Sequence, residues 1–167
     1  MTRNPTPDVA SIARARMWPL AAVCLLAGLL PCAVVQATAA QQVHANLAWI
    51  RVLPGALPAG AYVTLRNEGD QPVHLTGAKS SSYAQAMLHQ SSMSGGMSHM
   101  SGIESLAIPA HGQVVLAPGG YHLMLMHAVA PVVPGTRVRL TLEFSDGSSL
   151  PVDFLARPAN ALGPDSH

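Results

Sequence analysis

Short β-prone runs separated by turn residues fill this sequence from about residue 43 to residue 155, and they restrict the possible fold more than any other feature. Pro54-Gly55, Pro134-Gly135 and Asp146-Gly147 are typical turn pairs between such runs. No segment after residue 40 shows a sustained helical period. The pattern predicts nine strands, at residues 44–52, 61–67, 73–78, 84–90, 100–108, 113–116, 121–127, 137–144 and 150–155.

Alternation of apolar and polar residues is clearest between positions 137 and 144. Val138, Leu140, Leu142 and Phe144 fall on one face of this predicted strand, as in a strand that lies against a hydrophobic core. Several short strands with frequent turns favour a β-sandwich or a barrel, so we expect an all-β fold. The 167 residues suffice for one domain and hardly for two.

The first forty residues have the composition of a secretory signal peptide. Arginines precede an apolar run from Met17 to Val35, and an Ala-x-Ala pattern follows it. We therefore expect residues 1–40 to be a signal peptide, cut near Ala39 or Ala40, and the mature protein to lie in the periplasm. An uncleaved membrane anchor is the alternative, because the apolar run is long for a signal peptide.

The rest of the chain is expected to form one domain, residues 41–157, followed by a flexible C-terminal tail, residues 158–167. A formal net charge of +1 gives no reason to expect nucleic acid or an anionic membrane as a partner. We expect the mature domain to be monomeric and not inserted in a membrane. Both cysteines, Cys24 and Cys32, lie in the predicted signal peptide. A mature chain without thiols excludes cysteine-containing blue-copper sites, iron–sulfur clusters and thiol redox pairs.

Methionine and histidine gather in one part of the chain. The six methionines outside the predicted signal peptide lie within forty residues: Met87, Met93, Met97, Met100, Met124 and Met126. The histidines in this window or at its edge are His89, His99, His111, His122 and His127. Methionine is usually spread through cores as an adaptable filler. Residues 90–102 are expected to be a Ser/Gly-rich loop with no aliphatic residue, so its methionines are not expected to be core residues.

The spacing of four of these residues predicts a shared site. His122 and Met124 are two apart on a predicted strand, so their side chains leave the same face while the leucines that follow each of them enter the core. His89 ends one predicted strand and Met100 begins the next, so a hairpin brings them close together. Two imidazoles and two thioethers then meet at one point.

This donor set prefers Cu(I). Thioether sulfur is soft and neutral, so it binds Cu(I) in preference to Ca²⁺, Mg²⁺ or Mn²⁺. Zinc sites use thiolate, imidazole or carboxylate and hardly ever methionine. Neutral ligands also hold the ion less tightly than thiolates, which suits a carrier that releases it. We therefore expect one Cu(I) per chain, bound by His89, Met100, His122 and Met124.

The intervals between these four residues resemble the signature of a known family. His89, ten residues, Met100, twenty-one residues, His122, one residue and Met124 match the His-x10-Met-x21-His-x-Met pattern of the PCuAC family, the periplasmic copper chaperones for the CuA centre of cytochrome oxidase. The similarity covers about residues 42–155. It implies a cupredoxin-like Greek-key β-sandwich, and delivery of Cu(I) to the CuA site of cytochrome c oxidase, directly or through an Sco-type thiol protein.

The Ser/Gly-rich loop departs from the family pattern. Gln90 and Ser94-Gly95-Gly96 replace an acidic residue and an Asp-Gly turn that members often carry, and Met97 and His99 are additional. Met93, Met97 and His99 are either auxiliary copper ligands or part of a flexible Met-rich loop. The alternative function is therefore a periplasmic copper-resistance or sequestration protein that uses this loop. The tail lacks the long His/Met-rich extension that many members carry, so the resemblance does not extend to a second, cupric site.

Motifs of common enzyme classes are missing from the sequence. It holds no Gly-x-Ser-x-Gly, His-Glu-x-x-His or phosphate-loop motif. Glu104 is the only carboxylate between Asp70 and Glu143, so general acid–base chemistry near the histidines is poorly supplied. We therefore expect no enzyme activity. A sandwich that only binds other proteins, with incidental methionines, is the remaining alternative.

Overall fold

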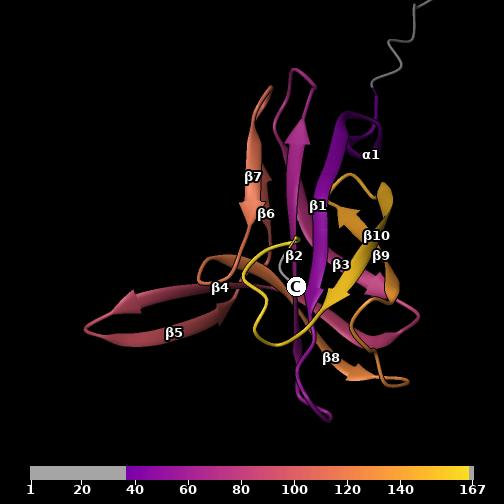
Figure 1. Cartoon of the computed structure of the whole chain (residues 1–167). Coiled ribbons are helices and arrows are strands. Elements are labelled where there is room, and N and C mark those ends of the chain that lie inside the picture. The colour runs from indigo at the N-terminus through magenta and orange to yellow at the C-terminus, as the bar shows by residue number, and fades with distance from the viewer. Residues whose placement is uncertain (1–36, 166–167) are drawn as a thin grey trace, which may run out of the picture. The chain divides into compact units, whose positions relative to one another are not determined.

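The computed structural model describes residues 37–165, so most of the predicted signal peptide lies outside the described part of the chain. Strands dominate this part, which confirms the all-β prediction. Among these residues no helix has the length and apolar character needed to cross a bilayer. The elements are α1 (Ala39–Gln42), β1 (Val43–Arg51), β2 (Ala59–Asn67), β3 (Val73–Ser80), β4 (Tyr83–Ser94), β5 (Met97–Gly102), β6 (Leu106–Ile108), β7 (Gln113–Leu116), β8 (Tyr121–Ala128), β9 (Arg137–Phe144) and β10 (Ser149–Arg157) (Figure 1).

The strands form one continuous sheet that folds over itself as a sandwich. Their order is β5-β4-β8-β2-β1-β10-β9-β3-β6, and β7 pairs with β2 outside this path. Neighbouring strands are antiparallel except β1 and β10, which run parallel from the pair Trp49↔Leu155 to the pair Arg51↔Arg157. This short contact joins the layer that contains β4, β8 and β2 to the layer that contains β9 and β3.

The core lies between these layers and follows the alternation predicted from the sequence. On β9, Val138, Leu140, Leu142 and Phe144 are at most 3% exposed. They belong to one apolar cluster with buried side chains of β2, β3, β8 and β10. Burial of apolar surface stabilises a fold by roughly 25 cal/mol per Å². In a domain without disulfides, this cluster is therefore the main source of stability.

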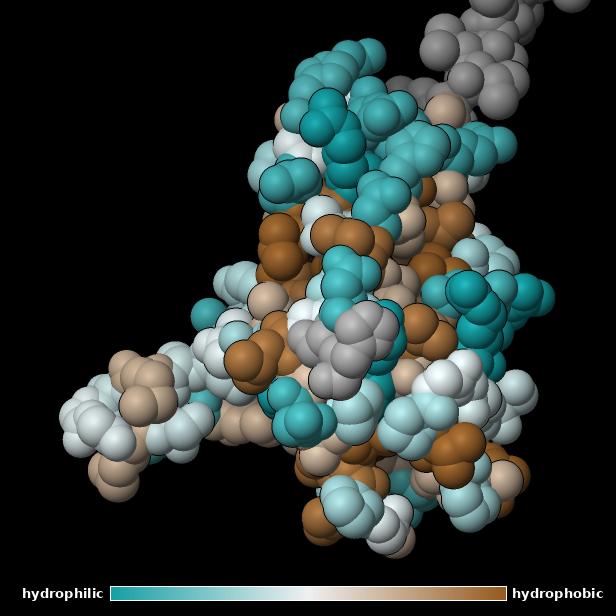
Figure 2. Space-filling model, viewed as in Figure 1, coloured by the Kyte–Doolittle hydropathy of each residue, from teal (hydrophilic) through white to brown (hydrophobic). Residues whose placement is uncertain are grey.

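The Ser/Gly-rich stretch that was expected to be a loop is a β-hairpin. β4 and β5 pair from His89↔Gly102 to Ser94↔Met97, and Gly95 and Gly96 form the turn with φ angles of 59° and 78°. Positive φ at both central residues is typical of a type I′ turn, which glycine adopts without steric cost. The hairpin projects from the sandwich as an arm (Figures 1 and 2). The loop prediction is wrong because these strands are defined by backbone pairing and not by apolar alternation.

The strand predicted at residues 100–108 is two strands, β5 and β6, so the prediction of a single strand is wrong. β5 pairs with β4, whereas β6 pairs with β3 in the other layer, where Leu106 lies opposite Leu75. The backbone N–H of Ile103, the first residue after β5, donates to the carbonyl of Leu88 on β4 at 3.0 Å. The strand breaks because its two halves have partners in different layers.

Both ends of the described chain are attached to the sandwich. Ala39 is 5% exposed, and its backbone N–H donates to Oδ2 of Asp146 at 2.8 Å. The predicted cleavage position near Ala39 therefore falls within α1. At the other end, Ala161 is 1% exposed and packs with Trp49 and Tyr62. This contact anchors part of the segment that was expected to be a flexible tail.

Candidate metal centre

Two histidines that are far apart in the sequence lie side by side on β4 and β8. The register of these antiparallel strands places His89 directly opposite His122. The ring centroids are 5.8 Å apart and the ring planes are inclined by 43°. Leu88, which precedes His89, and Leu123, which follows His122, are buried in the core. Because side chains alternate along a strand, both imidazoles stand on the outer face of this layer.

His122 is oriented by the backbone next to it. Its side chain is buried, and Nδ1 lies 3.1 Å from the carbonyl oxygen of Gly120. A carbonyl oxygen only accepts hydrogen bonds, so we assign the proton of the neutral ring to Nδ1 and the lone pair to Nε2. Metal-binding histidines commonly donate a hydrogen bond from their second ring nitrogen to a backbone carbonyl in this way. The lone pair of Nε2 is therefore available for a metal ion.

His89 is favoured in its neutral form, which is the form that binds metals. Burial and the neighbouring His122 both lower the pKa of His89 below its ordinary value, because each disfavours a charged ring. Among the described residues, Nδ1 of His89 is one of two buried side-chain nitrogens without a hydrogen-bond partner. An unpaired buried polar atom costs free energy, and coordination of a metal at this nitrogen removes that cost.

Met124 stands on the same outer face as His122, because the two residues are two apart on β8. Leu123 and Leu125 are fully buried, which confirms the alternation predicted for this strand. Met124 itself is half-buried and lies opposite Met87 of β4. Met87 lies two residues before His89 on β4, so it adds a further thioether to this face beyond the predicted ligands, and it is 43% exposed.

Met100 reaches the same face from the hairpin strand β5. It lies opposite Ser91, which is two residues beyond His89 on β4. Met100 is therefore a diagonal neighbour of His89, at a separation that long side chains span. The four predicted ligands, His89, Met100, His122 and Met124, thus project from one face of three adjacent strands.

Tyr62 borders this face on β2, and the sequence pattern did not single it out. Its ring centroid lies 6.4 Å from that of His122 and 4.6 Å from that of Trp49. Its hydroxyl accepts a hydrogen bond from Nη2 of Arg51 at 2.8 Å. A Cβ atom at Gly60 would lie 2.5 Å from the same hydroxyl, so the tyrosine ring occupies the space above that glycine. The ring shields one side of His122 from solvent.

Ligands for hard metal ions are scarce around the two histidines. Across residues 37–165, no three side chains of His, Cys, Asp or Glu lie close enough to hold a metal ion together. The other potential donors that share the outer face with the histidine pair are the thioethers of Met87, Met100 and Met124. Neutral nitrogen and sulfur donors fit Cu(I). Ca²⁺ and Mg²⁺ prefer oxygen ligands, and Zn²⁺ combines imidazole with thiolate or carboxylate and hardly ever with a thioether.

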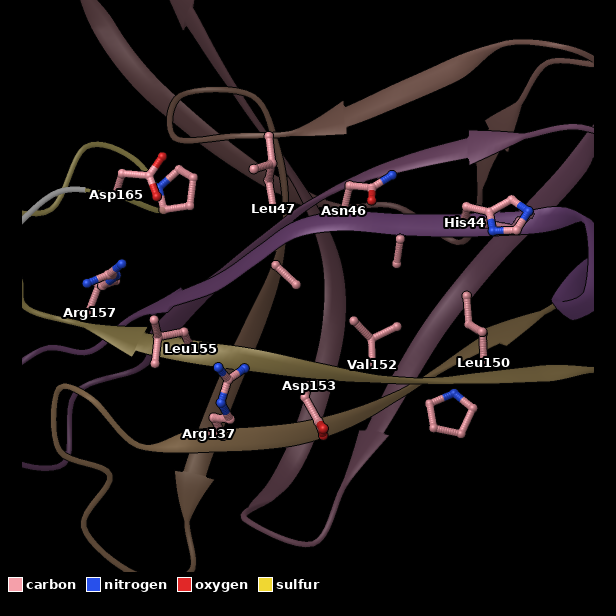
Figure 3. A pocket seen from close by; sticks show the side chains of 15 residues that line it. His44, Asn46, Leu47, Arg137, Leu150, Val152, Asp153, Leu155, Arg157 and Asp165 are labelled. Carbon is pink, nitrogen blue, oxygen red and sulfur yellow. The ribbon is translucent and has the colours of Figure 1, made fainter.

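A separate groove of about 580 Å³ lies where β1 and β10 diverge ahead of their short parallel contact (Figure 3). His44, Arg137, Asp153 and Arg157 line it together with apolar side chains of both strands. None of the four predicted ligands lines this groove, and its lining contains no sulfur. The groove therefore offers no second site for a soft metal ion.

Comparisons with known proteins agree with this geometry. A family model described as "Putative lipoprotein LpqE-like" matches residues 43–156. "Putative lipoprotein Lxx21020" from Leifsonia xyli subsp. xyli (strain CTCB07) is 35% identical over 136 residues, which cover 77% of this chain and 81% of that protein.

Solved structures share the same fold. The solution structure of CuI-DR1885 from Deinococcus radiodurans is 34% identical, with a TM-score of 0.56, and the match covers 75% of this chain and 83% of that one. The copper-bound PCuAC domain from PmoF2 is 23% identical, with a TM-score of 0.61, and the match covers 72% and 97% of the two chains. These likenesses confirm the β-sandwich.

Proposed function

Because the chain belongs to the LpqE-like family, which is the PCuAC family of copper-binding domains, we propose that it is an exported Cu(I) chaperone. It binds one Cu(I) per chain through His89, Met100, His122 and Met124, and releases the ion by ligand exchange. The observation that carries the proposal is the cross-strand pair of His89 and His122, with both methionines on the same outer face.

The acceptor that we propose is the CuA site of cytochrome c oxidase, reached directly or through an Sco-type thiol protein. Thiolates bind Cu(I) more tightly than neutral imidazole and thioether do, so transfer to such an acceptor is favourable. Met100 is 53% exposed, which supports access of a partner from the hairpin side of the site. A carrier needs such an open side, because the acceptor's ligands must reach the ion before the chaperone's ligands leave.

The compartment that we propose is the periplasm. The N-terminal sequence pattern supports export, and so does the word lipoprotein in the name of the Leifsonia relative. The donor set also suits an oxidising compartment, because thiolate ligands are lost to disulfides there and thioethers are not.

Anaerobic titration of the purified protein with Cu(I), in competition with the chelator bicinchoninate, tests this proposal. We expect one tightly held Cu(I) per chain. The double variant His122→Ala/Met124→Ala is expected to lose this binding and keep its β-sheet circular dichroism, because neither side chain belongs to the apolar cluster.

The matched control is Met126→Ala/His127→Ala, which removes one methionine and one histidine from the same strand. It is expected to keep stoichiometric binding. Full binding by the His122→Ala/Met124→Ala variant would rule out the proposed ligand set.

Copper sequestration is the second candidate function, and the exposure of Met93 and Met97 favours it. The same titration separates the two functions. Several Cu(I) per chain, lost in Met93→Ala/Met97→Ala, would indicate sequestration. A single Cu(I) that this variant retains would indicate a chaperone.

A further inference from the structure

The arm formed by β4 and β5 carries methionines that the sandwich does not bury. Met93 is 72% exposed, Met97 is 64% exposed and Met100 is 53% exposed. Every residue from Ser92 to Gly102 is exposed. In Figure 2 the arm is mostly pale with tan patches, in contrast to the brown areas of the main body. Packing in a core therefore does not explain why these positions hold methionine.

The register of the hairpin places Met93 on the face that holds the proposed copper ligands. Met100 lies opposite Ser91, and the next pair outward on the same face is Met93↔Ser98. His89 is on this face as well, one step closer to the sandwich. Met93 is therefore the outermost member of a row of nitrogen and sulfur donors that begins at the histidine pair.

Met97 and His99 belong to the opposite face of the arm. Met97 lies opposite Ser94, and His99 lies opposite Ser92. Side chains one residue apart in register point to opposite faces of a hairpin. Met97 is therefore nearly as exposed as Met93 and has the same chemistry, but it points away from the proposed copper ligands.

The spacing within the row suits stepwise movement of a metal ion. Met93 and Met100 are diagonal neighbours across the two strands, as are Met100 and His89. Diagonal neighbours are roughly 7–8 Å apart, within reach of long side chains. One ion bound by Met100 is therefore within reach of Met93 on its outer side and of His89 on its inner side.

On the basis of the proposed function, we infer that Met93 is a relay ligand that passes Cu(I) between the four-ligand site and a partner at the tip of the arm. In the outward step, a bond forms between copper and the sulfur of Met93 while Met100 stays bound. The bonds to His89, His122 and Met124 then break. Copper remains Cu(I), and no proton moves because all five ligands are neutral.

The relay gives an acceptor a more open target than the four-ligand site. His122 is 5% exposed and is covered on one side by Tyr62, so an incoming ligand has little access from that side. At the arm, the residues opposite Met93 and Met100 are Ser98 and Ser91, whose side chains are too small to obstruct a partner. The tip of the arm is therefore the surface that a copper acceptor contacts.

Transfer kinetics of Met93→Leu and of its control Met97→Leu test this inference. Leucine matches the size of methionine and removes only the sulfur donor. Cu(I) transfer to bicinchoninate and loading from the same chelator are followed anaerobically by stopped-flow absorbance in the full chain. A tethered ligand acts at millimolar effective concentration, so its loss is expected to slow both directions by about tenfold.

Equilibrium affinity separates the relay role from other roles. Met93→Leu is expected to keep the affinity of the wild-type protein, and with affinity unchanged both rates must fall by the same factor. Met97→Leu is expected to match the wild type in rate and in affinity. Equal rates in wild type and Met93→Leu would overturn the relay, and so would equal slowing by both variants. A loss of affinity in Met93→Leu would instead make Met93 a resident ligand and also overturn the relay. Failure of the wild-type protein to bind Cu(I) would be a failure of the proposed function itself.

Discussion

The two faces of β8 lie in different environments and have different tasks. Leu123 and Leu125 are fully buried in the apolar cluster. His122 and Met124 stand on the outer face, where each is paired with a residue of the neighbouring strand β4. The inner residues stabilise the sandwich by burial. The outer residues contribute little to the core and are positioned by the strand backbone and its pairing. Residues for folding and residues for copper therefore alternate along one strand, which allows each task to be changed separately.

The largest effect that we expect is a difference in unfolding free energy between substitutions at two adjacent residues of β8. Leu123→Ala removes a fully buried side chain and is expected to cost about 3 kcal/mol of unfolding free energy. Met124→Ala, half-buried on the outer face, is expected to cost less than about 1 kcal/mol of stability. The same Met124→Ala change is expected to lower Cu(I) affinity by at least about tenfold, equivalent to about 1.4 kcal/mol.

Urea denaturation without copper and chelator-competition titration with copper measure these two quantities in both variants. Leu123→Ala is expected to keep its copper affinity under conditions in which it remains folded. Equal stability losses in the two variants would contradict the division of tasks between the faces.

A smaller effect is expected at Gly60, where the two tasks meet. A methyl group there would lie 2.5 Å from the hydroxyl of Tyr62. This hydroxyl accepts a hydrogen bond from Arg51, and the tyrosine ring packs against Trp49. Gly60→Ala therefore displaces the ring beside His122. We expect a loss of about 1–3 kcal/mol in stability, together with weaker copper binding.

Gly77→Ala is the matched control for this substitution. Gly77 also lies in a strand, but the nearest atom to an added Cβ is the carbonyl oxygen of Ala86 at 4.0 Å. We expect a change within about 0.5 kcal/mol in unfolding free energy and unchanged copper binding. Gly60→Ala with wild-type stability and affinity would show that Tyr62 does not support the site.

Much of the fold was predictable from local sequence patterns. The alternation of Val138, Leu140, Leu142 and Phe144 predicted the inner face of β9, and all four are buried. Gly and Pro turns predicted most strand boundaries to within a few residues. These signals are local, because a strand with one buried face needs an apolar residue at every second position.

The sequence did not predict features that depend on which strands pair. Ser92, Ser94 and Ser98 gave no apolar alternation, so the hairpin arm was expected to be a loop, although Gly95-Gly96 is a recognised turn signal. The break between β5 and β6 follows from partners in different layers. Tyr62 comes next to His122 only through the pairing of β2 with β8, which is a long-range contact.

X-ray absorption at the copper K-edge of the Cu(I)-loaded protein is the most direct test of the central claim, that two imidazoles and two thioethers bind one Cu(I). We predict nitrogen and sulfur scatterers in equal number in the wild-type protein. His122→Ala is expected to lose imidazole scattering, and Met124→Ala to lose sulfur scattering. A copper site without sulfur neighbours, or a spectrum that neither substitution changes, would contradict the account.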